Sequence, residues 1–201
     1  MEVDFKMQER GATLDAVYKV SREGRMRIDI LKDGKRIYTE AYDGRQGWDW
    51  AEEGTKATID PHGDALWHGT QFPGTIFALS DMAALGHRLE YVGREQIDGV
   101  NYYVLKLTLR DGFETYRYVN PETWLIDRGR DFRAFHPAVN DRKTWVETLW
   151  SDYPDVGGVL RPFVSTNVDL TTARQLARQE ISAYKVNPSF DPAIFSMPDI
   201  K

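Results

Sequence analysis

Histidine and carboxylate side chains are the first candidates for chemistry in this chain of 201 residues. His62 and His68 share one polar stretch with Asp60 and Asp64, and these side chains are all possible metal ligands. The stretch lacks the compact H-E-x-x-H spacing of a helical zinc site, and the chain contains no cysteine. Exposed loop residues are therefore the simpler interpretation, and we expect no metal and no cofactor.

Nucleophilic and acid–base motifs lead to the same expectation. The sequence has no G-x-S-x-G elbow and no glycine-rich phosphate loop, and without cysteine it has neither thiol nucleophiles nor disulfides. The adjacent Glu52 and Glu53 would point apart on a strand, which favours solvated charges. We expect no catalytic site, but an enzyme that uses His62, Asp64 and His68 on an apolar small molecule stays open as an alternative.

Composition argues against two further classes of protein. The formal net charge is −5 and the basic residues are spread along the chain, so no footprint for nucleic acid is visible. The longest apolar runs, residues 76–79 and 82–85, are far shorter than the ~20 residues that span a bilayer. We expect no nucleic-acid partner, no membrane-spanning segment, and one domain over residues 1–201.

Aromatic residues are abundant, with 6 Trp, 10 Tyr and 9 Phe. Trp48 and Trp50 are two residues apart, so they share one face of a strand. A well-filled core is one interpretation of this content. The other is that a twisted antiparallel sheet with little helix to cover it leaves a concave apolar face, where a lipid would bind.

Period-two alternation and regularly spaced turn residues predict antiparallel strands along most of the chain. The expected strands cover residues 14–20, 26–30, 36–42, 47–51, 89–95, 102–110, 114–119, 124–128, 145–150 and 160–168. We expect loops at residues 52–71 and 129–142.

One amphipathic helix is predicted over residues 72–86. Pro73 stands near its start, Gly86 at its end, and one stripe holds Phe72, Ile76, Leu79 and Ala83. Residues 171–186 also have apolar residues at helical spacing, but they lie between strands, so helix and strand both stay open for them.

Four segments carry a resemblance to a known family: residues 42–48 (YDGRQGW), 118–126 (YVNPETWLI), 151–162 and 186–198. In order and spacing they resemble the LolA/LolB-like superfamily of outer-membrane lipoprotein-sorting proteins. The resemblance implies a mainly β fold, a strongly curved antiparallel sheet that forms an incomplete barrel closed by one or a few helices. It also implies a cavity for acyl chains, a periplasmic or envelope location with the export signal outside this chain, and a strand at residues 171–186.

The sequence departs from the family pattern in three places. Strand-like sequence begins almost at once, so the helix that opens the family's carrier is not seen, and neither is the protruding leucine loop of its anchored receptor. An arginine next to a proline helps to hold the carrier's lid. Arg22 is near the matching place, although Glu23 follows it, and the resemblance offers Arg22 as a lid latch.

These observations together predict a carrier that binds a lipid or an acylated lipoprotein and catalyses no reaction. The residues expected in the cavity wall and the lid are Trp48, Trp50, Phe77, Leu79, Met82, Trp124 and Trp145. A sensor or interaction module of the same fold, with an envelope protein as its partner, is the second alternative.

Overall fold

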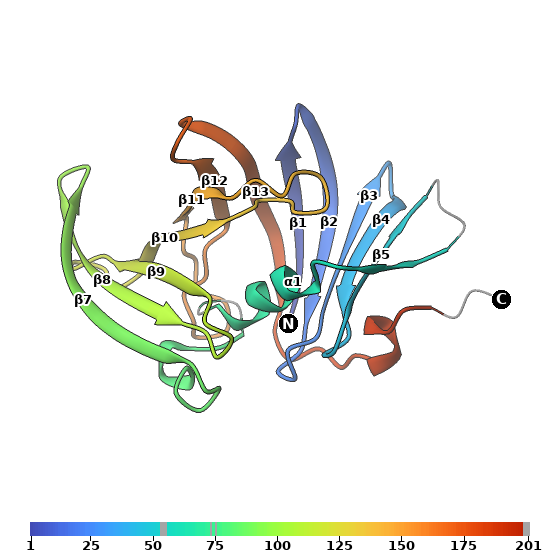
Figure 1. The fold of residues 1–201 in the computed structure, drawn as a ribbon, viewed down its shortest axis with the longest axis horizontal. Helices are drawn as coiled ribbons and strands as arrows, with labels where there is room; N and C mark the ends of the chain where they lie inside the picture. Colours follow the sequence, from blue (N-terminus) through green and yellow to red (C-terminus); the bar gives the residue numbers. More distant parts are fainter. Residues whose placement is uncertain (53–55, 73, 75, 199–201) are drawn as a thin grey trace.

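A computed structural model describes residues 1–52, 56–72, 74 and 76–198. The strands of this part form one antiparallel sheet (Figure 1). They are β1 Glu2–Glu9, β2 Ala12–Val20, β3 Met26–Lys32, β4 Lys35–Tyr42, β5 Gly47–Ala51, β6 Thr58–Asp60, β7 Arg88–Ile97, β8 Val100–Thr108, β9 Glu114–Val119, β10 Ile126–Arg133, β11 Thr144–Ser151, β12 Val164–Asp169 and β13 Arg174–Lys185. The helical elements are α1 Gly63–Gln71 and two 3-10 turns, η1 Leu79–Asp81 and η2 Pro192–Phe195. Among the described residues, no helix is long and apolar enough to cross a membrane.

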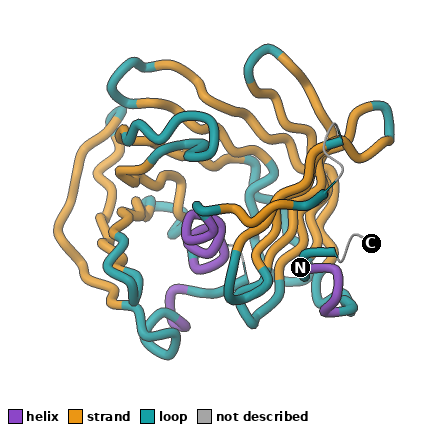
Figure 2. The backbone as a smooth tube through the Cα atoms, turned by 45° about the vertical axis from the view of Figure 1, so that its right-hand side comes forward, coloured by secondary structure: helices purple, strands orange, loops and turns teal. Residues whose placement is uncertain are grey.

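The strand order joins two meanders at the middle of the sheet. It runs β6-β5-β4-β3-β2-β1-β13-β12-β11-β10-β9-β8-β7, so the first strand pairs with the last. The edges are β6 and β7, which follow each other in sequence. Residues 61–87, here named the cover segment, therefore run from one edge of the sheet to the other. The sheet curves around α1, which belongs to this segment (Figure 2).

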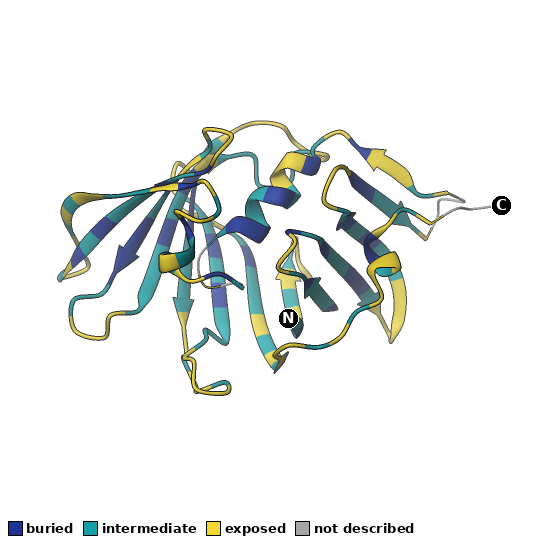
Figure 3. Ribbon diagram, turned by 90° about the horizontal axis from the view of Figure 1, so that it is seen from below, coloured by how far each residue is buried: buried dark blue, intermediate teal, exposed yellow. Residues whose placement is uncertain are grey.

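The cover segment defines the two faces of the sheet. Its Trp67, Phe77 and Met82 form a buried cluster with Leu107 of β8, and Tyr42 of β4 packs against the same cluster. We call the face that carries Leu107 and Tyr42 the inner face. Side chains alternate along a strand, and residues opposite each other on neighbouring strands share a face. The pairing register therefore shows, for each of the remaining strand residues, whether its side chain lies on the inner or the outer face. Figure 3 shows buried residues along α1 and on the strands to both sides of it.

The mainly β fold and the open, curved sheet expected from the sequence are confirmed. The predicted strands at residues 47–51 and 114–119 coincide with β5 and β9. Residues 171–186 contain β13, so the strand interpretation of that segment is confirmed.

The predicted helix at residues 72–86 is wrong. Gly74 has a φ of 90° and Gly86 a φ of 78°, and among the described residues between them only those of the short η1 are helical. Pro73, expected near the helix start, lies outside the described residues. Of the expected apolar stripe, Phe72 and Ile76 pack against the cluster of the cover segment, whereas Ala83 is exposed. The spacing of apolar residues does not report backbone dihedral angles, and the positive φ of Gly74 and Gly86 is incompatible with a continuous helix.

Two predicted loops are also wrong in part. Residues 52–71 contain β6 and α1, and residues 129–142 contain the second half of β10. The start of α1 lies directly against β5: a Cβ on Gly63 would lie 2.5 Å from the backbone nitrogen of Gly47. Both residues at this contact must therefore be glycine. Gly63 belongs to the glycine-, aspartate- and histidine-rich stretch whose composition resembled that of a loop. The last predicted strand begins later than expected, at Val164.

Candidate ligand-binding site

The inner face of the N-terminal half is apolar. Its buried members are Val3, Phe5, Ala16 and Ile30. Around them lie side chains that are only partly buried: Met7, Leu14, Tyr18, Ile28, Tyr38, Ile181 and Tyr184. They belong to β1, β2, β3, β4 and β13, which are neighbours in the sheet. We name this set the apolar wall.

The apolar wall stays partly open because α1 is short. The nine residues of α1 contact β3, β4 and β5, and the backbone approach of Gly63 to Gly47 places the helix start at one end of β5. The end of α1 reaches the turn before β3, where Gln71 lies near Gly24. The wall extends from there along β3 and its neighbours, beyond the reach of the helix.

Arg22 and Arg161 contact the cover segment from opposite halves of the sheet. The guanidinium of Arg22 lies 5.9 Å from the ring centroid of Phe77. The Nη1 of Arg161 donates a hydrogen bond to the carbonyl oxygen of Gly74 at 2.9 Å. Arg22 follows β2 and Arg161 precedes β12, so the cover segment is held from both halves of the sheet.

A second crossing is made by the loop between β10 and β11. Its His136 lies with Nε2 2.9 Å from a carboxylate oxygen of Glu9, at the end of β1. Three strands separate β1 from β10 in the sheet, so this contact spans the hollow of the curve (Figure 1). Burial acts to raise the pKa of Glu9, but the contact with His136 outweighs it and holds that pKa below its ordinary value.

The inner face of the C-terminal half carries buried polar residues on β9, β10 and β12, between the apolar cluster at Leu107 of β8 and the apolar wall. Its buried residues include Thr115, Arg117, Asp131, Ser165 and Asn167. Hydroxyl groups on this face donate to acceptors on neighbouring strands: Thr115 to Asp131 at 3.0 Å, Thr148 to Asn167 at 2.9 Å and Ser165 to Gln179 at 2.9 Å. We name this set the polar wall.

Arg117 of β9 lies within the polar wall between two rings. Its guanidinium is 4.5 Å from the ring centroid of Phe72 and 5.3 Å from that of Trp150. The side chain also fixes the identity of Gly129 on β10, because a Cβ there would collide with Arg117 and with the Trp150 ring. Burial lowers the pKa of Arg117, and nearby Asp131 acts in the opposite direction. An arginine remains charged despite such a shift.

The structure brings Phe77 and Met82 together in the buried cluster of the cover segment and places the four expected tryptophans elsewhere. Leu79 is partly buried in η1, three residues before Met82. Trp124 is 69% exposed at the turn between β9 and β10, where it stacks on Tyr103 with centroids 5.6 Å apart.

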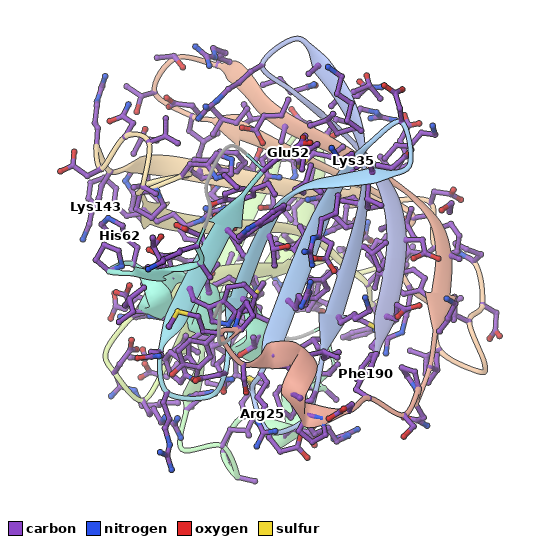
Figure 4. The ribbon with its side chains drawn as sticks, turned by 90° about the vertical axis from the view of Figure 1, so that its right-hand side faces the viewer. Arg25, Lys35, Glu52, His62, Lys143 and Phe190 are labelled. Carbon is purple, nitrogen blue, oxygen red and sulfur yellow. The ribbon has the colours of Figure 1, made fainter. Side chains whose placement is uncertain are left out.

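Trp48 and Trp50 point to the outer face. Gly47 must face inward against Gly63, so alternation turns both tryptophans outward. The Nε1 of Trp48 donates to the carbonyl oxygen of Phe195 at 2.8 Å, which places the ring under η2. Figure 4 shows η2 in front of the strands on this outer side.

Trp145 also lies on the outer face, opposite Phe132 in the pairing of β10 with β11. It borders a groove of ≈ 480 Å³ whose lining includes Val104, Tyr116, Tyr118 and Arg130. Arg130 is neutralised there by ion pairs of 2.8 Å with both Glu95 and Glu147. Trp145 is therefore on the other side of the sheet from Phe77 and Met82.

The histidines do not form a shared site. His62 precedes α1, while His68 in its last turn lies 2.6 Å from a carboxylate oxygen of Asp111 and stacks on Phe113. Burial acts to raise the pKa of Asp111, but the hydrogen bond with His68 outweighs it and lowers that pKa. His87 is buried, and burial lowers its pKa. Among the described residues, no group of three or more His, Asp or Glu side chains is arranged to hold a metal ion.

Sequence reasoning missed the polar wall and Arg117. Residues 114–119 alternate so that either the tyrosines or Thr115 and Arg117 face inward, and composition favours the aromatic choice. The pairing of Arg117 with Gly129 decides the matter, but it joins residues from different strands. Gly129 was the signal in the sequence that could have indicated this contact, since a glycine within a strand often marks a close approach by another group.

Comparison with solved structures finds the same fold in three bacterial proteins. A LolA superfamily protein from Nitrosomonas europaea has a TM-score of 0.64 at 15% identity, covering 97% of this chain and 88% of that one. A domain assigned to outer membrane lipoprotein-sorting proteins, from Vibrio parahaemolyticus, has a TM-score of 0.62 at 10% identity, with coverage of 96% and 88%. A DUF1329 family protein from Desulfovibrio piger has a TM-score of 0.60 at 13% identity, with coverage of 97% and 88%.

No family model and no curated protein matches the sequence. At these identities the structural matches show a shared fold. The resemblance carried by the four sequence segments is thus confirmed at the level of architecture.

Proposed function

We propose, from the premise that this chain has the LolA/LolB-like fold, that it binds a lipid or an acylated protein on its inner face and carries or presents it. The reaction is binding alone, with no bond made or broken. The location that goes with this role is the periplasm or cell envelope, and the partners are the acylated ligand and the envelope protein that receives it.

The apolar wall is the observation that carries the proposal. A core that only stabilised the fold would be covered, whereas Tyr18, Ile28 and Tyr38 are partly exposed on a concave surface. Large apolar surfaces left open in this way are typical of binding sites. Each methylene that an acyl chain buries there contributes about 0.8 kcal/mol, so ten methylenes supply roughly 8 kcal/mol, which is of the same order as the cost of association.

The cover segment forms the other side of the proposed site. Phe77 and Met82 form its buried apolar core, Leu79 is partly exposed in η1, and Arg22 lies over the ring of Phe77 from the end of β2. In this proposal Arg22 acts as the latch that the resemblance implied. Trp48, Trp50, Trp124 and Trp145 take no part in the wall.

Native mass spectrometry of protein purified without detergent tests the proposal. Bound lipid or acylated protein should be retained by the wild type and by Ile59→Asn, since Ile59 is exposed on the outer face. Ile28→Asn should lose it, because the polar amide would lie within the apolar wall. Equal retention by both variants, or no retained ligand in the wild type, would contradict the proposed site.

A further inference from the structure

Arg117 differs from every other buried polar residue of the polar wall. Its Nε and Nη2 are buried and have no hydrogen-bond partner in the part of the chain that the structure describes. The neighbouring carboxylate of Asp131 is engaged by the hydroxyl of Thr115 and by an ion pair of 3.2 Å with Arg133. Burying a cation without a partner is unfavourable, so the structure holds a charge that a bound anion would compensate.

The geometry of the guanidinium defines what it would bind. The guanidinium carbon lies over the rings of Phe72 and Trp150, so apolar atoms surround the charged group. Nε and Nη2 lie on the same edge of a guanidinium and donate in parallel. That fork matches two oxygens of one group, as in a carboxylate or the phosphodiester of a phospholipid.

The position of Arg117 relates it to the apolar wall. The polar wall and the apolar wall meet at β13, where Gln179 pairs with Ser165 on one side and with Met7 on the other. One inner surface therefore changes from apolar to polar along the sheet. An amphipathic ligand has the same division.

We propose that Arg117 binds the anionic end of a ligand whose acyl chain lies on the apolar wall. This inference rests on the proposed function and specifies the ligand class. One unpaired cation is balanced by one negative charge, so the group is a monoanion with two equivalent oxygens. A fatty acid and an anionic phospholipid both supply it.

Binding of palmitate, hexadecanol and dipalmitoyl phosphatidylglycerol to the full chain tests the proposal, with the quenching of tryptophan fluorescence as the signal. Charged hydrogen bonds of this kind make palmitate bind at least about tenfold more tightly than hexadecanol. In Arg117→Met the preference falls below about threefold, while the affinity for hexadecanol is kept. Arg117→Lys retains an intermediate preference because it has charge but no fork.

Arg36→Met is the matched control. Arg36 also stacks on a tryptophan, with its guanidinium 4.7 Å from the Trp50 ring centroid, but it is on the outer side and partly exposed. This variant should keep the full preference for palmitate. Thermal melting of each variant reports whether the fold is retained.

The outcomes separate the two proposals. Equal binding of palmitate and hexadecanol by the wild type, or an unchanged preference in Arg117→Met, overturns the role of Arg117 alone. Failure of all three ligands to bind overturns the proposed function as well. Tighter binding of palmitate or of the phosphatidylglycerol assigns the source of the anion.

A carboxyl signal provides a readout that a structural role of Arg117 would not move. In palmitate labelled with ¹³C at the carboxyl, the pKa of the bound carboxyl should lie below its ordinary value in the wild type. In Arg117→Met the same pKa should return to or exceed the ordinary value. An identical titration in both proteins would overturn the contact.

Discussion

The two walls of the inner face have the same architecture and opposite chemistry. The apolar wall is built on Val3, Phe5 and Ile30, and much of its rim stays accessible. The polar wall is built on Thr115, Asp131 and Asn167 and is buried. Exposure and polarity are therefore inverted between the two walls. Part of the apolar wall is accessible to water, whereas the polar side chains of the polar wall are buried, an arrangement that suits a ligand better than it suits the solvent.

Truncation of a buried side chain in the apolar wall tests whether this wall also stabilises the fold. Ile30→Ala removes a side chain that is 7% exposed and should lower the free energy of unfolding by about 3 kcal/mol. Urea denaturation measures the change. Ile59→Ala, on an exposed position of β6, should change it by less than about 0.5 kcal/mol. Equal losses would show that the wall has no special weight in the fold.

The next prediction tests the packing of the polar wall. Gly129→Ala places a Cβ against Arg117 and the Trp150 ring and should cost about 2 kcal/mol. In the background of Arg117→Ala the same change should cost clearly less, because one of the two colliding groups is gone. A double-mutant cycle in urea measures this coupling, and additive losses would mean that Arg117 does not lie over Gly129.

A smaller effect of opposite sign is expected at Arg117 itself. Arg117→Met replaces an unpaired buried charge by apolar atoms of similar length, so without ligand it should leave stability unchanged or raise it by about 1 kcal/mol. Removing the carboxylate of Asp131 should do the reverse, since Arg133 would lose its partner. A marked loss of stability in Arg117→Met would indicate that the guanidinium is satisfied in the free protein.

The smallest effect is a dependence on pH within the apolar wall. Glu40 of β4 lies opposite Ile28, and burial raises its pKa above the ordinary 4.5. Ionisation of this carboxyl is therefore easier in the unfolded chain, and the charge costs stability once the pH exceeds the folded pKa. Glu40→Gln should melt at a higher temperature than the wild type at pH 8, and the difference should vanish below pH 4.5. A difference that is constant with pH would contradict this origin.

The sequence carried the fold but only part of the site. Alternation at residues such as Leu105 and Leu107 identifies a sheet because each strand reports its own period, and turn residues report the hairpins. The choice of face depends on contacts between distant residues. Gly47 turns Trp48 outward because it meets Gly63, and Gly129 admits Arg117 from the next strand. The helix expected at residues 72–86 failed for the same reason, since Phe72, Ile76 and Leu85 pack against the cluster of the cover segment from backbone that is not helical.

The pairing of β1 with β13 has a consequence for how this protein folds. Glu2 lies opposite Lys185, so the centre of the sheet closes a loop of nearly the whole chain. Contacts of such separation form slowly, after the hairpins on either side of them. Until the last strand arrives, the apolar surface of β1, β2 and β3 is exposed to other chains. The nascent protein therefore depends most on protection from aggregation in the interval before β13 has been made.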